Sequence, residues 1–215
     1  KKHIAHACFW EDVEQYEVDA SFARKKDKDG NFIKQLDKDG KVVMGPIPAF
    51  TIISHDDIKN GLYVPKCLGS ADEKKKLMNH CLWYTKELDK KGRFLLCIWP
   101  EHCRIGTKGQ AIVPPLNDAL TEWCKTTSKC LSFINKTESH MTEMYSALEA
   151  EVVLPDDKTT MLNRSFLGRL KIADQVRFPL VLNFLFQFRL YLFFLCQIAY
   201  YLRRSKITLC ELHHA

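Results

Sequence analysis

The spacing of apolar positions predicts one long amphipathic helix near the middle of the chain. Apolar side chains recur at three- and four-residue steps among lysines and glutamates over residues 70–91, which is typical of a helix with one buried face. These positions are Leu77, Cys81, Trp83, Tyr84 and Leu88. Ser70 with Glu73 fits a capping box at the start, and Gly92 fits the stop.

Short apolar runs on both sides of that helix predict strands. Residues 94–99 form a continuous apolar run ending at Pro100, and residues 131–134, Leu-Ser-Phe-Ile, form a short, mostly apolar run. The β-branched run 50–53 precedes a capped helical turn at Ser54. A second helix begins with Pro114 in its first turn. Its predicted buried stripe is Leu116, Ala119, Leu120 and Trp123. Because strands follow helices along the chain, we expect an α/β fold with a mostly parallel sheet.

A near-repeat interrupts the pattern over residues 25–48. The letters Asp-Lys-Asp-Gly occur at 27–30 and again at 37–40, each followed by apolar pairs. Asp-Gly between apolar residues is a hairpin signal, because glycine tolerates the positive φ of the turn. A calcium loop is the alternative, but the other oxygen ligands of a twelve-residue loop are missing. We expect a surface excursion.

Composition excludes some classes of protein. A chain of 215 residues suits a single α/β domain. Its net charge of +6 is spread along the sequence, with no basic stripe interleaved with aromatics, so we expect no nucleic-acid partner. Nine cysteines without Cys-x-x-Cys pairs indicate free thiols in a reducing, cytoplasmic setting. With neither an initiator Met nor a signal-peptide core, the chain is expected to begin partway into a larger protein.

Few side chains are placed where chemistry is expected. His102 follows the predicted strand 94–99, and in parallel sheets such loops build the ligand crevice; the alternative is a surface histidine. His3 and His6 have a spacing that suits zinc but is more often incidental. Lys136 lies just past the predicted strand 131–134, where a lone lysine is usually solvated. Cys103 points away from His102 on an extended chain, so we assign it to packing.

Two motifs resemble a known family. Residues 99–109 are similar to the Trp-Pro-x-His-Cys-x-x-Gly-Thr-x-Gly segment of the nicotinamidase and isochorismatase-like cysteine hydrolases. Residues 134–137 and 143–148 resemble that family's lysine loop and its Asp-Ser-Tyr-Ser-Ala-Phe segment, in the same order. The resemblance covers about residues 1–176 as one domain. It implies a three-layer α/β/α fold with a mostly parallel sheet, incomplete in this chain.

The resemblance also implies a mechanism. Lys136 matches the lysine of a Cys-Asp-Lys triad, and its charge would favour the thiolate that attacks a small ring carboxamide such as nicotinamide. Ammonia leaves from a thioester, which water cleaves to nicotinate. His102 matches a ligand of a divalent metal, by family zinc. The other ligands, an Asp and a His, would lie before Lys1; His3 and His6 are weaker candidates.

The sequence departs from the family near its end. The nucleophile should follow a strand near residues 171–176 in a glycine-containing elbow, yet no glycine occurs after Gly168. We therefore assign the nucleophile neither to Cys196 nor to Cys210, and the triad aspartate is also lacking. Two functions stay open. One is a nicotinamidase-like hydrolase acting on a small amide; the other is a non-catalytic family member or fragment that binds a partner or a membrane, with oligomerisation open.

Residues 177–215 form a Phe- and Leu-rich tail that does not match the family. The stretch 177–202 is long enough to span a membrane, but Arg189 near its middle argues against that. A core segment is a second interpretation. The hypothesis we favour is an out-of-frame or intron-derived translation, because family character stops abruptly at Val176. For residues 1–176, the central expectation is that His102 and Lys136 face one hollow.

Overall fold

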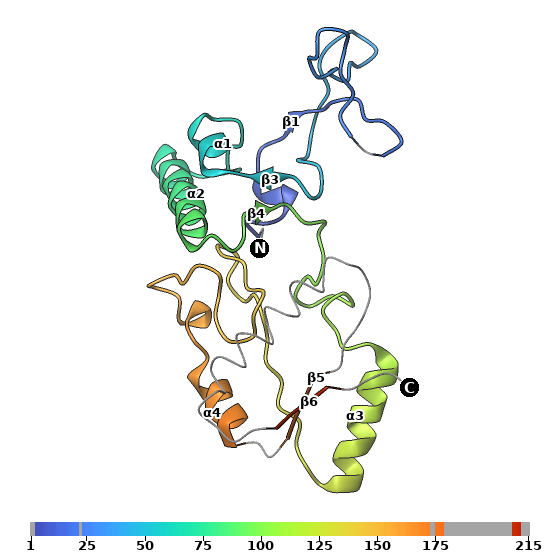
Figure 1. Ribbon diagram of the computed structural model, residues 1–215, viewed down its shortest axis with the longest axis vertical. Helices are drawn as coiled ribbons and strands as arrows, with labels where there is room; N and C mark the ends of the chain where they lie inside the picture. The colour runs from blue at the N-terminus through green and yellow to red at the C-terminus, as the bar shows by residue number, and fades with distance from the viewer. Residues whose placement is uncertain (1–2, 22, 173–174, 179–207, 212–215) are drawn as a thin grey trace. The chain divides into compact units, whose positions relative to one another are not determined.

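The computed structural model describes residues 3–21, 23–172, 175–178 and 208–211. Its internal contacts divide the chain into two compact units, Lys1–Leu131 and Ser132–Ala215. Figure 1 labels most of the helices and strands. Each unit has its own buried side chains and is described separately below. The predicted boundary after residue 176 stays a prediction.

Two helices of the first unit begin at serine caps. In α1 (His55–Lys59) the Ser54 hydroxyl accepts from the Asp57 backbone N–H, and the Asp57 carboxylate accepts in return. Ser70 and Glu73 form the same reciprocal pair at α2 (Ala71–Lys91). Gly92 ends α2 at φ 59°, with its N–H bonded to the Leu88 carbonyl. The predicted long helix, its cap and its stop are confirmed.

The core of the first unit lies between these helices and the short strands. α1 contacts α2. The Trp10 indole is buried and donates to the Ile4 carbonyl at 2.8 Å, so its polar atom is satisfied inside the core. On the face of α2 that we predicted to be buried, Trp83 is 37% exposed. Other large side chains buried here include Ile53, Ile58, Tyr84, Leu88, Leu96 and Ile98.

The strands of the first unit are short and pair antiparallel. β3 (Ile52–Ile53) pairs with β4 (Leu96–Cys97), and β1 (Val13–Glu14) pairs with β2 (Met44–Gly45). The prediction of a three-layer α/β/α fold around a mostly parallel sheet is therefore wrong. A continuous apolar run indicates burial on both sides but not strand direction, and the connection through α1 and α2 returns the chain antiparallel to β3.

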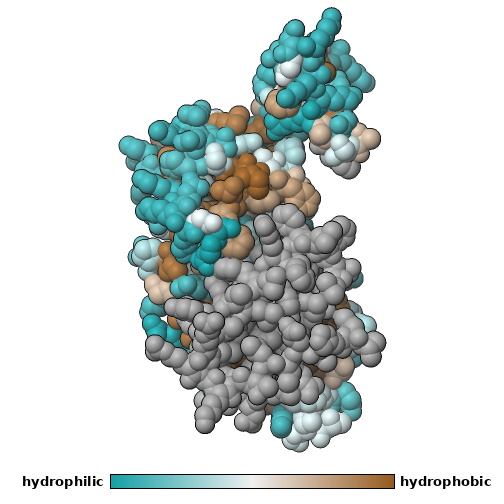
Figure 2. Space-filling model, viewed as in Figure 1, coloured by the Kyte–Doolittle hydropathy of each residue, from teal (hydrophilic) through white to brown (hydrophobic). Residues whose placement is uncertain are grey.

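The near-repeat builds two equivalent turns. An Asp27 carboxylate oxygen accepts from the backbone N–H groups of Asp29 and Asn31, each at 2.9 Å. Asp37 accepts in the same way from Asp39 and Lys41. The glycine of each turn has a positive φ, 86° in the first and 78° in the second. The hairpin turns and the exposed excursion are confirmed, and its surface is mostly hydrophilic in Figure 2.

The second predicted helix forms, but its stripe is not buried. α3 (Pro114–Thr127) starts at the predicted proline. It has no buried residue: Leu116 is 52% exposed and Trp123 is 42% exposed. The prediction of a buried stripe at Leu116, Ala119, Leu120 and Trp123 is wrong. Periodicity shows which side chains share a face of a helix, and not whether another element covers that face.

The second unit buries hydroxyl groups among its apolar side chains. Thr142 donates to the Val152 carbonyl at 2.8 Å, and Thr160 donates to the Asp157 carbonyl at 2.7 Å, so both hydroxyls are satisfied. Its helical segments are η2 (Lys158–Thr160) and α4 (Arg164–Ile172). Residues 131–134 form no strand, which corrects the prediction. From residue 128 to residue 157 the chain has no regular helix or strand.

Two strands lie near the end of the chain. β5 (Gln175–Phe178) pairs parallel with β6 (Thr208–Glu211), with Gln175 opposite Thr208. This single pair is no counterpart of the expected sheet. The interpretations of the Phe- and Leu-rich tail, including a membrane span over 177–202, fall almost wholly outside the described residues. Among the helices that the structure describes, none has the length and apolar character needed to cross a bilayer.

Candidate functional site

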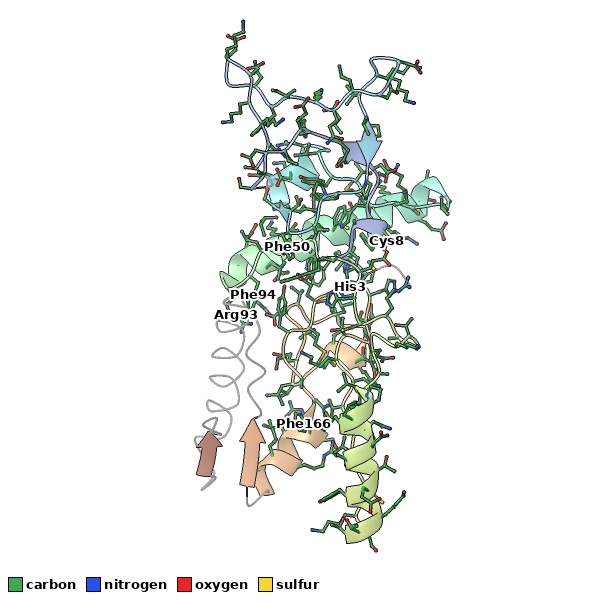
Figure 3. All side chains as sticks on the ribbon, turned by 90° about the vertical axis from the view of Figure 1, so that its right-hand side faces the viewer. His3, Cys8, Phe50, Arg93, Phe94 and Phe166 are labelled. Atoms are coloured by element: carbon green, nitrogen blue, oxygen red, sulfur yellow. The ribbon has the colours of Figure 1, made fainter. Side chains whose placement is uncertain are left out.

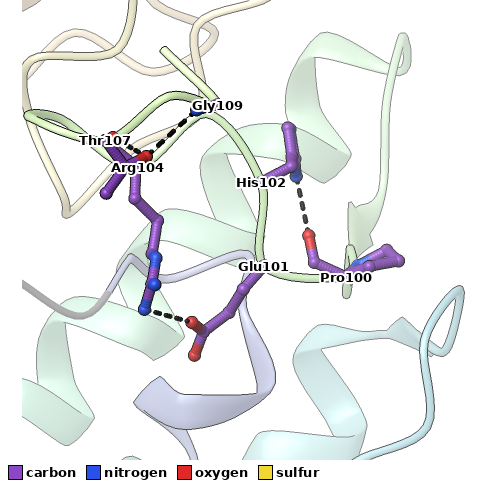
Figure 4. Close-up of polar contacts among 6 residues, drawn as sticks. All are labelled: Pro100, Glu101, His102, Arg104, Thr107 and Gly109. Carbon is purple, nitrogen blue, oxygen red and sulfur yellow. Dashed lines mark hydrogen bonds and ion pairs between the residues drawn. The ribbon is translucent and has the colours of Figure 1, made fainter.

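The loop after β4 folds on itself through local hydrogen bonds (Figure 4). The Glu101 carboxylate pairs with Arg104 at 3.3 Å. The Thr107 hydroxyl donates to the Arg104 carbonyl at 2.7 Å and accepts from the Gly109 N–H at 3.3 Å. All residues from 100 to 110 are exposed. These contacts give the loop carrying His102 a defined path although little of it is buried.

Three histidines gather where this loop meets the N-terminal segment. The ring centres of His6 and His102 are 5.3 Å apart, and those of His3 and His6 are 5.4 Å apart. A backbone bridge holds the segments together: His6 pairs with Trp99, and the Trp99 N–H donates to the Ala5 carbonyl at 2.8 Å. Figure 3 labels His3 in this part of the first unit. The pairing therefore sets the separation of His6 and His102.

Backbone groups select the tautomers of two of these rings. His102 Nδ1 lies 2.7 Å from the Pro100 carbonyl oxygen. Since a carbonyl only accepts, Nδ1 carries the proton and the neutral ring keeps its lone pair on Nε2. His3 Nδ1 accepts from the Ala5 N–H at 3.1 Å, so its lone pair is already engaged. His102 is thus better prepared to bind a cation than His3.

The electrostatic surroundings favour neutral His6. Partial burial lowers the pKa of His6, the neighbouring His102 lowers it further, and the Glu101 carboxylate opposes the shift. The pKa of Glu101 is itself lowered, first by the Cys8 thiol that donates to it and then by the charge of Arg104. Neutral imidazole is the form that binds metals. Because its pKa is lowered, the Glu101 carboxylate places a negative charge beside the two imidazoles.

The separation of the His6 and His102 rings is close to that of two imidazoles bound to one metal ion. Two imidazoles bound to one tetrahedral zinc at about 2.0–2.1 Å have ring centres roughly 5 Å apart. The observed 5.3 Å between His6 and His102 agrees with that separation. Over the residues that the structure describes, however, no group of three or more His, Cys, Asp or Glu side chains is arranged to hold a metal. The described side chains thus bring two imidazoles close together, and His3 does not complete a set of three.

Lys136, the predicted lysine of the triad, lies in the second unit. It is exposed, and its ammonium donates to the Tyr145 carbonyl at 3.1 Å. The following residue, Thr137, has a φ of 59°. His102 belongs to the first unit, so the expectation that these two residues face one hollow stays a prediction.

Sequence reasoning misplaced one residue of the site and missed two. Cys103 is exposed, with a φ of 46°, so its assignment to packing is wrong. Glu101 and Cys8 were missed, although their hydrogen bond joins the loop to the N-terminal segment. The spacing of His6 and Cys8, two residues apart, was the signal available for Cys8. For Glu101 the only signal in the sequence was its position next to His102.

Comparison of the chain with known proteins adds no relative. No protein-family model matches the sequence, and neither the curated proteins nor the solved structures give a significant match. The family resemblance therefore rests on the two motifs alone.

Proposed function

We propose that this chain is a nicotinamidase-like domain that binds a small ring carboxamide beside a divalent metal held by His6 and His102. The observation that supports this is the spacing of the two imidazoles, 5.3 Å between ring centres, one of which, His102, lies on the loop that resembles the family's histidine motif. The proposed metal is zinc, for which imidazole is a common ligand. The proposed compartment is the cytoplasm, on the basis of nine cysteines without Cys-x-x-Cys pairs.

Each residue has a separate proposed task. His102 offers Nε2, because its Nδ1 proton is committed to the Pro100 carbonyl. His6 offers a ring whose pKa is lowered by burial, which favours the neutral form. When bound, the metal would supply a positive charge that orients the ring nitrogen of the amide or a water molecule. Lys136 would favour a nearby thiolate through its charge. Glu101 adds negative charge beside the pair and would strengthen cation binding.

One sequence feature favours a binding role over turnover in this chain. Hydrolysis through a thioester needs a thiolate at a sharp strand-to-helix elbow, and glycine is absent from residues 169–215. The second candidate function is therefore a non-catalytic domain that keeps the ligand site. Ammonia release separates the two functions, while metal binding tests the site that they share.

Metal binding is tested by titrating the purified chain with zinc, and with cobalt as a spectroscopic substitute. We expect one ion per chain, and an affinity reduced by more than about 100-fold in His102→Ala, since even outer-shell changes cost 10–100-fold. His6→Ala should act in the same direction. The matched control is His80→Ala, because His80 lies on α2 beside Trp83 and Tyr84. Equal affinities for wild type and His102→Ala would overturn the proposed site.

Turnover is tested by measuring ammonia released from nicotinamide by the zinc-loaded chain and by its Lys136→Ala variant. A rate that falls in the variant identifies the hydrolase. Equal background rates, together with zinc binding that depends on His102, identify the non-catalytic domain. The rate of ammonia release by Lys136→Arg shows whether the charge alone is sufficient, because arginine keeps the charge but holds it in a wider planar group.

A further inference from the structure

Two cysteines of the first unit stand opposite each other at the end of one backbone pairing. Trp10 pairs with Pro65 in an antiparallel bridge, and a hydrogen bond of 2.8 Å extends the pairing by one residue on each chain. In an antiparallel register, each step back along one chain is a step forward along the other. The next pair in register is therefore Cys8 with Cys67. Both thiols are free and half-buried.

Buried side chains hold the two chains together just before the cysteines. Phe9 is 4% exposed and Trp10 is 1% exposed, and Pro65 opposite them is buried as well. Opposed residues of an antiparallel pair have Cα atoms roughly 4.5–5.5 Å apart. A disulfide spans Cα atoms about 4.4–6.8 Å apart. The register position of Cys8 and Cys67 thus meets the main geometric requirement for a disulfide.

The last step of the register needs a local movement, and the loop at Cys67 is placed to make it. Cys8 lies in the 3-10 turn η1 (Ala7–Phe9), so the extended pairing stops at Phe9. Residues 66–69 are in neither a helix nor a strand, and Leu68 next to Cys67 is 95% exposed. Few buried contacts therefore resist a shift of this loop toward Cys8. The same exposure lets a small reagent reach Cys67.

The Cys8 thiol also joins this pair to the histidine loop. Cys8, labelled in Figure 3, donates a hydrogen bond to the Glu101 carboxylate, and this bond is the largest cause of the lowered pKa of Glu101. A sulfur in a disulfide has no proton to donate. A bond between Cys8 and Cys67 would therefore remove this side-chain link, while the backbone bridge between His6 and Trp99 remains.

We propose that Cys8 and Cys67 form a reversible disulfide when the protein meets a small-molecule disulfide, which makes the pair a site of oxidative modification. The Cys67 sulfur attacks the reagent and displaces one of its two thiols, and the Cys8 sulfur then attacks Cys67 and displaces the other. One S–S bond and two S–H bonds are broken, and the same numbers are formed. The protein loses two electrons and two protons, which the reagent takes up.

The inference goes beyond the proposed function and does not depend on it, because the reaction needs neither a metal nor an amide. Disulfides of proteins in a reducing compartment are usually transient, and they respond to the ratio of oxidised to reduced small thiols. The proposed bond belongs to this class. Its formation would report that ratio at the segment that carries His6.

The test exposes the full chain, in zinc-free buffer, to oxidised glutathione at a fixed concentration of reduced glutathione. The remaining thiols are alkylated and the peptides are mapped by mass spectrometry. We expect two peptides joined through Cys8 and Cys67. Half-formation should need at least about 10-fold less oxidised glutathione than the mixed disulfide at exposed Cys103, because the second thiol of the pair is held beside the first. Dithiothreitol should reverse the bond.

Single substitutions assign the two sulfurs. Cys8→Ser should leave Cys67 as a mixed disulfide with glutathione, because no second thiol displaces it. Cys67→Ser should likewise abolish the joined peptides. The matched control is Cys124→Ser, because Cys124 is also free and half-buried, and this variant should form the bond as wild type does.

The wild-type map decides the inference without any variant, so a variant that fails to fold does not affect it. Mixed disulfides alone at Cys8 and Cys67 would overturn the inference, and so would a bond from Cys8 to Cys103. A Cys8–Cys67 bond that forms only after the chain is unfolded in urea would also overturn it. None of these outcomes bears on zinc binding by His102, which the titration of the proposed function measures separately.

Discussion

Cys81 and Cys103 carry the same thiol in opposite surroundings. Cys81 is fully buried in α2, and burial raises its pKa to about 12, whereas Cys103 is exposed on the histidine loop. The thiolate is the species that reacts with disulfide reagents. At pH 8 we expect an aromatic disulfide reagent to label Cys103 in the folded chain and to reach Cys81 only after unfolding. Mass spectrometry of the labelled peptides measures this. Labelling of Cys81 at the Cys103 rate would contradict its burial.

The raised pKa of Cys81 also makes stability depend on pH. Above the ordinary thiol pKa of 9.0 the unfolded chain loses this proton, while the folded chain keeps it up to about 12. The free energy of unfolding therefore falls as the pH rises through that window, by at most about 1.4 kcal/mol per pH unit. Urea unfolding at pH 8, 9 and 10 should show a shallower decline in Cys81→Ala than in wild type. Cys103→Ala is the control and should keep the wild-type decline.

Gly92 and Gly168 predict opposite results for one substitution. Gly92 has a φ of 59°, which alanine adopts only with strain, whereas Gly168 lies within α4. An added methyl group would meet no atom within 4 Å at either site. We expect Gly92→Ala to lower the free energy of unfolding by about 1 kcal/mol and Gly168→Ala to raise it by up to about 1 kcal/mol. Chemical denaturation of the two variants measures both signs, and equal signs would contradict the backbone argument.

Local signals predicted single residues well where the cause was local. Ser70, Glu73 and Gly92 take their predicted roles because a cap needs only a nearby hydroxyl, a carboxylate and a residue that accepts a positive φ. No local signal predicts the positive φ of Phe50, because hydrogen bonds join its turn to Ile98, 48 residues further along the chain. The prediction that Cys103 packs inside the protein was wrong for a related reason. We assumed an extended chain, and its φ is positive.

Among the elements, α2 begins at a capping box whose hydrogen bonds stabilise its first turn. The Ser70 hydroxyl accepts from the Glu73 N–H, and Glu73 accepts from both the N–H and the hydroxyl of Ser70. Ser70→Ala should lower the free energy of unfolding by about 1 kcal/mol, within the range of 0.5–2 kcal/mol known for caps. Urea denaturation followed by circular dichroism measures the loss. Ser165→Ala, in the first turn of α4, is the matched control and should change stability by less than about 0.5 kcal/mol.

The strands show where element prediction reached its limit. The runs 94–99 and 50–53 do contain β4 and β3, so apolar character located them. Their direction was not in the pattern, because a short apolar run indicates a strand buried on both faces, and such a strand can pair in either sense. The run 131–134 forms no strand. A four-residue apolar run becomes a strand only where a partner is available, and the sequence does not show the partner.

At the scale of the molecule, internal contacts divide the chain into two compact units. Chain length and composition suited a single domain, since 215 residues can bury one core. Length bounds the amount of core, but it does not show how the core is divided. The candidate site shows the same limit. His6 and His102 were both candidates from the sequence, yet only the backbone bridge between the N-terminal segment and Trp99 brings their rings together.

Each unit has a buried leucine, so a leucine-to-alanine substitution in each unit can test whether the two units have separate cores. Leu96 and Leu148 are each 1% exposed, the first in β4 and the second among the buried hydroxyls of the second unit. Leu→Ala at a buried site costs about 2–5 kcal/mol, because it removes apolar contacts and leaves a cavity. We expect Leu96→Ala to speed amide hydrogen exchange first around Ile53 and Ile98, and Leu148→Ala to speed it first around Val152 and Leu167. Peptide-resolved exchange with mass spectrometry measures both patterns. An identical loss of protection throughout the chain in the two variants would show one cooperative core and contradict the division into units.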